Sequence, residues 1–121
     1  MSRNVIKILE KDFSDMKAGD KMLISSPEDI AGYISQIPEG KTVTPREMRF
    51  DLAREKGADN SCPVSTGIFL RMAIEDVLRV FKLEDCPLPF WRVVDETHPV
   101  LKKLGIPPSD ITRKRQQEIP G

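Results

Sequence analysis

This 121-residue sequence has two cysteines, Cys62 and Cys86, and one histidine, His98, the residue types whose side chains ionise nearest to neutral pH. Cys62 precedes Pro63, and because a proline can open a helix but not interrupt one, the thiol lies at a predicted helix start. The positive end of the helix dipole favours a thiolate there, which permits nucleophilic or redox chemistry. We prefer a simpler interpretation, in which Cys62 fills the corner before the helix and Cys86 is structural. The two cysteines have neither the spacing of metal ligands nor companion histidines, and the sequence has no glycine-rich loop that would bind a phosphate. We therefore predict no bound metal ion and no cofactor.

The overall charge argues against a strong general attraction to nucleic acid. Lysine and arginine together number 19, as do aspartate and glutamate, so a basic surface could only be local. No apolar run approaches the ~20 residues of a membrane span, and charge interrupts the N-terminal segment too early for a signal peptide. We therefore expect a soluble, cytoplasmic protein with reduced thiols and no membrane partner.

The chain is organised around a helix that is predicted from Pro63 to about Phe81. Apolar residues occupy most of its circumference, so we expect this helix to be central and largely buried. Its polar stripe, formed by Arg71, Glu75 and Arg79 with Asp76 beside it, has the i, i+4, i+8 spacing of charged residues that pair on a solvated helix face.

Two shorter helices precede the central one, and both have clear start signals. Ser26 and Pro27 begin the first of them as N-cap and first-turn residue. The segment Thr44-Pro45-Arg46-Glu47 is a capping box with a proline in the first turn, and the helix that it opens is expected to stop at Gly57. A short polar turn then leads into the central helix. The pair has the pattern of a helix-turn-helix with the second helix in the recognition position.

Short extended segments complete the predicted fold. Residues 22–24 and 41–43 are brief strand candidates, and residues 90–94 are the best strand because they are aromatic and β-branched. Pairing of 41–43 with 90–94 would form a small two-stranded β wing. We therefore predict a mainly α (α+β) fold, a winged helix-turn-helix, in three parts: an arm or short amphipathic helix (1–25), the winged-helix domain (26–106) and a polar basic tail (107–121).

Three stretches of the sequence carry a resemblance to a known family. They are IPEGKTVT at residues 37–44, VSTG at residues 64–67 and PFWRVV at residues 89–94. In this order they resemble the DNA-binding domain of alkylguanine-DNA alkyltransferases and their alkyltransferase-like relatives, and the middle stretch matches chiefly at Gly67. The resemblance covers about residues 26–104. It implies a winged-helix fold whose recognition helix binds the minor groove of duplex DNA.

The same alignment implies a domain without the family's reaction. The family's alkyl acceptor is a cysteine thiolate that is activated by the next histidine, and these positions hold Phe90 and Trp91. Neither side chain can act as a nucleophile or a base. The arginine that the family uses to prop open the gap of a flipped base falls at about Val64, and its tyrosine falls at Pro45. The alkyltransferase-like relatives keep the histidine and the arginine, so this chain departs further than they do.

Two groups of binding candidates follow from the resemblance. The DNA-facing group comprises Thr44, Pro63, Val64, Ser65, Thr66, Gly67 and Arg71, and the base-pocket group comprises Pro45, Pro89, Phe90, Trp91 and Arg92. Phe90 and Trp91 either stack on a flipped base or pack within the protein, and successive residues of a strand point to opposite faces. Arg92 is expected to hold a loop carbonyl or a carboxylate rather than a phosphate. Ser65 and Thr66 either face DNA or bond the free N–H groups of the first helical turn.

The sequence-based hypothesis is therefore a catalytically inactive, alkyltransferase-like DNA-binding domain that recognises alkylated guanine or other damaged bases. The alternative is a protein-interaction module that keeps the winged-helix fold without binding DNA and recruits a partner through its tail or its N-terminal arm. An enzyme that uses Cys62 or Cys86 is the least favoured hypothesis.

Overall fold

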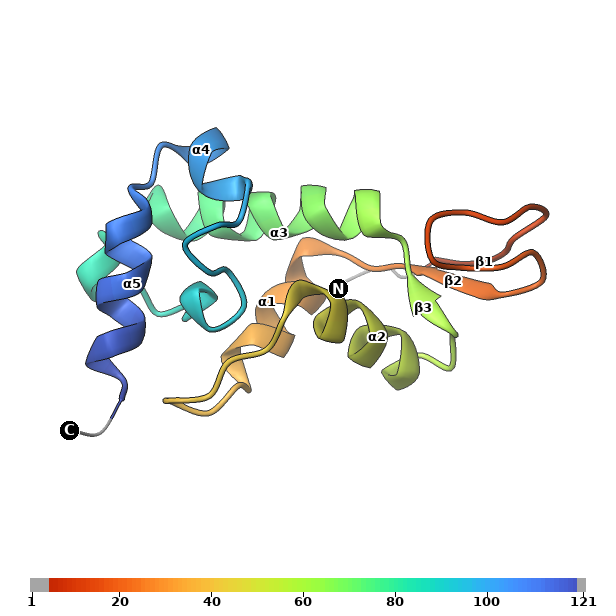
Figure 1. Cartoon of the computed structure of the whole chain (residues 1–121), viewed down its shortest axis with the longest axis horizontal. Helices are drawn as coiled ribbons and strands as arrows, with labels where there is room; N and C mark the ends of the chain where they lie inside the picture. The colour runs from red at the N-terminus through yellow and green to blue at the C-terminus, as the bar shows by residue number, and fades with distance from the viewer. Residues whose placement is uncertain (1–4, 120–121) are drawn as a thin grey trace.

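The computed structural model describes residues 5–119, which form a mixed α and β fold. In chain order the elements are β1 (Val5–Ile8), β2 (Lys21–Ile24), α1 (Pro27–Ser35), α2 (Pro45–Glu55), β3 (Asn60–Ser61), α3 (Pro63–Leu78), the 3-10 turns η1 (Leu83–Asp85) and η2 (Phe90–Arg92), α4 (Val100–Leu104) and α5 (Pro108–Gln117). Figure 1 shows α3 as the long central helix, with the small sheet at one end of the molecule and α5 at the other. None of the helices in residues 5–119 is long and apolar enough to cross a membrane.

The predicted starts of the first two helices are confirmed. The Ser26 hydroxyl accepts a hydrogen bond from the Asp29 amide at 3.2 Å and so caps α1. At the start of α2 the Thr44 hydroxyl accepts from the Glu47 amide at 3.1 Å, and the Glu47 carboxylate accepts from the Thr44 amide at 3.0 Å. The helix ends where predicted, because Gly57 adopts a φ of +78°, a conformation that favours glycine.

The Thr44 cap gives a first prediction. Thr44→Ala should lower the free energy of unfolding by about 1 kcal/mol, since the first turn of α2 loses a side-chain acceptor for its free N–H groups. Chemical denaturation measures the effect. The matched control is Thr42→Ala, an exposed position two residues earlier in the loop, which should change stability by less than about 0.5 kcal/mol. Equal effects of the two variants would contradict a role for the cap.

The main core lies between α1, α2 and α3. Six large side chains from these helices are buried to 2% exposure or less: Ile30, Ile34, Met48, Leu52, Leu70 and Ile74. The outer face of α3 carries the predicted polar stripe, and its four charged residues pair with one another. Arg71 pairs with Glu75 at 3.1 Å, whereas Arg79 pairs with Asp76 at 3.2 Å instead of Glu75. The prediction of a central helix is therefore confirmed, with its end at Leu78 rather than Phe81. The prediction that this helix is largely buried is wrong, because Val64, Ile68 and Met72 form a second, apolar face that is exposed.

Of the two alternatives predicted for the N-terminal residues, an arm or a short amphipathic helix, the helix is wrong for the described part. Val5–Ile8 is strand β1, which pairs antiparallel with β2, and β2 pairs parallel with the two-residue β3. The helical spacing of apolar residues is interrupted by a loop, residues 9–20, in which Ser14 and Gly19 have positive φ angles. The β-branched residues of β1 instead extend along β2, whose extended conformation is confirmed. Residues 1–4 of the predicted arm lie outside the described residues.

The predicted strand at residues 90–94 is also wrong, and with it the two-stranded wing. Phe90–Arg92 is a 3-10 turn, closed by a hydrogen bond from the Val93 amide to the Phe90 carbonyl at 3.0 Å. Residues 41–43 are not a strand either, although the Val43 amide donates to the Arg92 carbonyl at 2.8 Å. A tight turn lets the consecutive rings of Phe90 and Trp91 both point inward, which the alternation of a strand forbids. This burial of two large rings explains the departure from β propensity.

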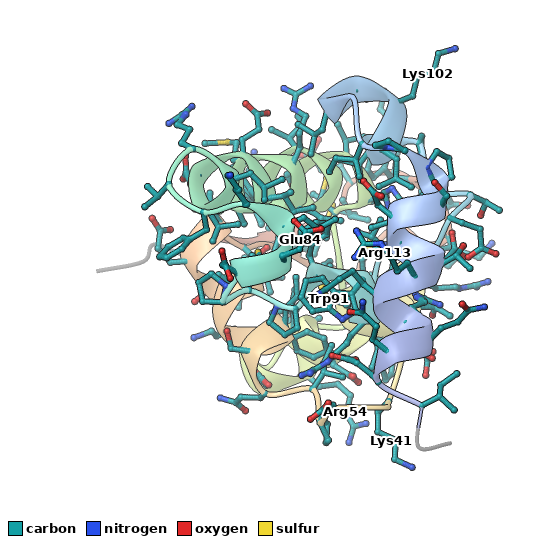
Figure 2. The ribbon with its side chains drawn as sticks, turned by 90° about the vertical axis from the view of Figure 1, so that its left-hand side faces the viewer. Lys41, Arg54, Glu84, Trp91, Lys102 and Arg113 are labelled. Atoms are coloured by element: carbon teal, nitrogen blue, oxygen red, sulfur yellow. The ribbon has the colours of Figure 1, made fainter. Side chains whose placement is uncertain are left out.

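The described part of the predicted tail is not a solvated segment. Residues Pro108–Gln117 form α5, and its Ile111 is fully buried in the main core. Figure 2 shows α5 beside Trp91, with Arg113 directed toward Glu84, to which it pairs at 3.0 Å. The Arg115 guanidinium donates to the Trp91 carbonyl at 2.6 Å. The domain therefore includes this helix, beyond the boundary predicted at residue 106.

Candidate binding groove on helix α3

A groove runs over the N-terminal half of α3. It consists of two adjoining hollows of about 430 and 480 Å³, which share Pro63, Gly67, His98 and Pro99. We call it the α3 groove. Its outer part is also lined by Val64, Ile68, Arg71, Val100 and Lys103, and its inner part by residues that include Asp15, Pro45, Arg46, Arg49 and Thr66.

The floor of the α3 groove is apolar and open. Val64 and Ile68 lie one helical turn apart and are 60% and 46% exposed. Between them, Gly67 has no side chain, and a Cβ atom placed there would meet no other atom within 4 Å. An apolar surface of this kind on a helix start favours close approach by a flat or helical partner.

His98 presents a neutral hydrogen-bond donor to the groove. Its Nδ1 accepts a hydrogen bond from the Val100 amide at 3.0 Å, so the neutral ring carries its hydrogen on Nε2. Burial lowers the pKa of His98 below its ordinary value, and the opposing effect of Asp95 is smaller. The imidazole is therefore uncharged at pH 7 and acts as a positioned polar group in an apolar surface.

Positive charge lies along the rims of the groove. Lys103 and Arg71 lie on the outer part, and the Arg71 side chain is 41% exposed despite its pair with Glu75. Arg46 lies on the inner part with a side chain that is 80% exposed. These three cations surround the apolar floor and suit a ligand with peripheral negative charge.

Asp15 counteracts part of this charge at the inner end. Its carboxylate accepts from the Arg49 guanidinium at 2.8 Å and lies 3.8 Å from that of Arg46. The hydrogen bond from Arg49 holds the pKa of Asp15 below its usual value, so the carboxylate is ionised at pH 7. Arg49 also donates to the Ser61 carbonyl at 3.0 Å, and it is therefore engaged within the protein.

The structure brings most of the predicted DNA-facing residues to this groove. Pro63, Val64, Gly67 and Arg71 line it, and Thr66 closes its inner part while only 3% exposed. The other two lie elsewhere. Ser65 is half-buried and lines neither hollow, and Thr44 faces a separate polar hollow beside Glu47 and Phe50.

The predicted base pocket is not assembled. Of its five residues only Pro45 lines the α3 groove. Pro89, Phe90 and Trp91 are buried, and the two rings contact edge to face with centroids 5.6 Å apart. Arg92 donates to the Ile37 carbonyl at 2.6 Å and pairs with Glu118 at 2.7 Å, which confirms the expected role of holding a carbonyl and a carboxylate.

Both cysteines have structural surroundings. Cys62 is the N-cap residue of α3, is 8% exposed and packs with Met16 and Met22 in a small second core. The Cys86 thiol donates to the Leu88 carbonyl at 3.2 Å, and burial raises the pKa of this thiol. Neither thiol lines the α3 groove. Within residues 5–119 no cluster of histidine, cysteine and acidic side chains is suited to hold a metal ion.

Sequence reasoning missed five groove residues that carry a charge or an imidazole: Asp15, Arg46, Arg49, His98 and Lys103. The signal for His98 was its uniqueness, and that for Lys103 was a pair of lysines near a glycine stop. Neither signal indicates which helix lies opposite.

Comparison with protein-family models, with curated proteins and with solved structures finds no match to this chain.

Proposed function

We propose that this protein is a non-enzymatic DNA-binding domain of the alkyltransferase-like type, in which α2 and α3 act as the helix-turn-helix and the predicted wing is missing. The observation that carries the proposal is the α3 groove. Four residues expected to face DNA on the basis of sequence, Pro63, Val64, Gly67 and Arg71, line one open surface at the start of the second helix. The resemblance of residues 26–104 to the alkyltransferase family supplies the class of ligand.

The apolar floor and the charged rims of the α3 groove fit the minor groove and the sugar-phosphate backbone of duplex DNA. Apolar and small residues on the floor suit the wall of a minor groove, where readout of base sequence is poor. Arg46, Arg71 and Lys103 on the rims can each contact a phosphate, and His98 can donate to a sugar or base oxygen. Recognition of an alkylated or damaged base is part of this proposal. Because Phe90 and Trp91 are buried, the groove rather than a pocket around these rings is the surface proposed for that recognition.

The test is a fluorescence-polarisation titration with two matched short duplexes, one plain and one carrying a single alkylated guanine, at about 50 and 200 mM salt. Three phosphate contacts correspond to a slope of about −2.7 in log affinity against log salt, so affinity should fall roughly 40-fold between these concentrations. Tighter binding to the alkylated duplex would support recognition of damage. Absence of binding to both duplexes at the lower salt would refute DNA binding.

Two adjacent lysines provide a matched pair of variants for this titration. Lys103 lines the groove, whereas Lys102, on the same helix α4, does not line it. Lys103→Glu should weaken binding at least about fivefold and reduce the salt slope by about one unit, because a phosphate contact is replaced by repulsion. Lys102→Glu, with the same change of charge, should stay within about twofold of the unchanged protein. Equal losses would indicate a general charge effect and contradict binding at the groove.

A second candidate function is a protein-interaction module, and one specific observation favours it. Val64, Ile68 and Met72 form an exposed apolar stripe with i, i+4, i+8 spacing, and they are 60%, 46% and 41% exposed. Such a stripe suits the apolar face of another helix. This candidate predicts no salt-sensitive binding to nucleic acid, so the same titration separates the two functions.

A further inference from the structure

The outer strand of the sheet has an open edge. Within residues 5–119 the strand order is β1-β2-β3, so β1 pairs with β2 on one side and with no described strand on the other. All four residues of β1 are exposed, and three of them are large and apolar: Val5 is 47%, Ile6 44% and Ile8 69% exposed. An apolar strand edge is a template for pairing with another strand, and folded proteins usually protect such edges. Figure 1 shows this sheet at the end of the molecule opposite α5.

The hydrogen-bond pattern identifies the free backbone groups of β1. The Leu9 amide donates to the Asp20 carbonyl at 3.0 Å, which directs the backbone of residue 9 toward β2. Because backbone groups alternate along a strand, those of Lys7 and Val5 also face β2. The N–H and C=O groups of Ile6 and Ile8 therefore point to the open edge. An added antiparallel strand would bond to these two residues.

We propose that the open edge of β1 pairs antiparallel with β1 of a second copy of this chain, which makes a weak two-fold symmetric dimer with a continuous six-stranded sheet. In an antiparallel pair, residues whose backbone groups face the partner strand lie opposite each other. In β1 these residues are Ile6 and Ile8, so three two-fold symmetric registers are possible: Ile6 opposite Ile8, Ile8 opposite Ile8, and Ile6 opposite Ile6. Ile6 opposite Ile8 of the other copy places Lys7 directly opposite a second Lys7, and like charges at this position are destabilising. Ile8 opposite Ile8 leaves only this one pair within the bounds of β1, whereas Ile6 opposite Ile6 leaves three. The remaining register, with Ile6 opposite Ile6 on the axis, places each Lys7 opposite a Val5.

Three further observations favour a second copy as the occupant of this edge. The formal net charge is zero, so two copies do not repel each other through their overall fields. The sheet lies at one end of the molecule, so the helices of two copies extend away from the axis (Figure 1). The two Ile6 side chains meet on one face of the joined sheet, and each covers apolar surface of the other. With four residues per edge the buried area is small, and an interface of this size corresponds to weak association.

Sedimentation equilibrium of the full chain, from about 10 µM to about 1 mM, tests the proposal in the range expected for a small interface. The average mass should rise with concentration toward twice the monomer mass. Ile6→Lys and Ile6→Glu should each raise the dissociation constant at least about tenfold, because like charges then meet on the axis. An equimolar mixture of these two variants should associate again, since opposite charges face each other. Val80→Lys, at a 76% exposed position beyond α3, is the control and should associate like the unchanged chain.

Each other outcome would overturn the proposal. A chain that remains monomeric up to about 1 mM has no such dimer. Association that survives both single variants uses another surface. If both variants are monomeric and the mixture is too, the two Ile6 positions do not face each other. Ile6→Pro gives an independent check and should abolish association, because the lost amide faces the open edge and the bonds between β1 and β2 remain.

Discussion

Phe90→Ala is expected to lower the free energy of unfolding by about 3–5 kcal/mol, a large part of the 5–15 kcal/mol that is typical of a folded domain. Phe90 is 0% exposed and belongs to the main core, where its ring contacts Trp91 edge to face. Removal of the ring leaves a cavity that the surrounding helices fill only in part, and the lost ring contact adds to the cost. Urea denaturation followed by circular dichroism measures the change.

The same variant separates two roles for this position. A ring that lined an open base pocket would be exposed without its ligand, and its removal would cost little stability. Phe81→Ala is the matched control, because Phe81 is 43% exposed beyond the end of α3 and should change stability by less than about 1 kcal/mol. If Phe90→Ala were no more destabilising than Phe81→Ala, the assignment of Phe90 to the core would be wrong.

Elements with local start signals could be predicted from the sequence, and those that depend on distant partners could not. The caps at Ser26 and Thr44 and the stop at Gly57 act within four residues, so the sequence contains all their physical causes. β1 forms because β2 lies beside it, and residues 90–92 turn because the interior accepts two rings. Neither cause can be read from residues 5–8 or 90–94 alone, since β propensity depends on the tertiary environment.

The candidate groove was predictable on one wall only. The face of α3 that includes Val64, Gly67 and Arg71 was expected from the resemblance to the alkyltransferase family, whereas helical periodicity predicted a largely buried helix. The opposite wall is formed by His98 and Lys103, more than 25 residues later in the chain, and no local pattern relates them to α3. Asp15 reaches the inner end from the loop between β1 and β2, a segment that the sequence pattern placed in a helix or arm. Its pairs with Arg46 and Arg49 could therefore not be foreseen.

Glu118→Gln is expected to lower the free energy of unfolding by about 2–3 kcal/mol at pH 7, because a buried guanidinium loses its charged partner. The side chains of Arg92 and Glu118 are 14% and 12% exposed, and their atoms approach to 2.7 Å. This pair joins the end of α5 to the turn at residues 90–92. Two cations of α5 contact Trp91 in the same turn: Arg115 donates to its carbonyl, and the Lys114 ammonium lies over its ring. The expected loss therefore includes weaker docking of α5, which hydrogen exchange of its amides would detect.

The pH dependence of this loss identifies the carboxylate as its cause. The hydrogen bond from Arg92 holds the pKa of Glu118 below its ordinary value of 4.5. A carboxyl whose pKa is lower in the folded state stabilises the fold above the unfolded value, and this stabilisation is lost as pH falls through the folded value. The difference between the unchanged chain and Glu118→Gln should therefore be constant above about pH 5.5 and should shrink as pH falls below 4.5. Glu96→Gln, at an exposed turn position, is the control and should show no such difference. A difference that persisted unchanged to about pH 2 would mean that shape, not charge, holds α5 in place.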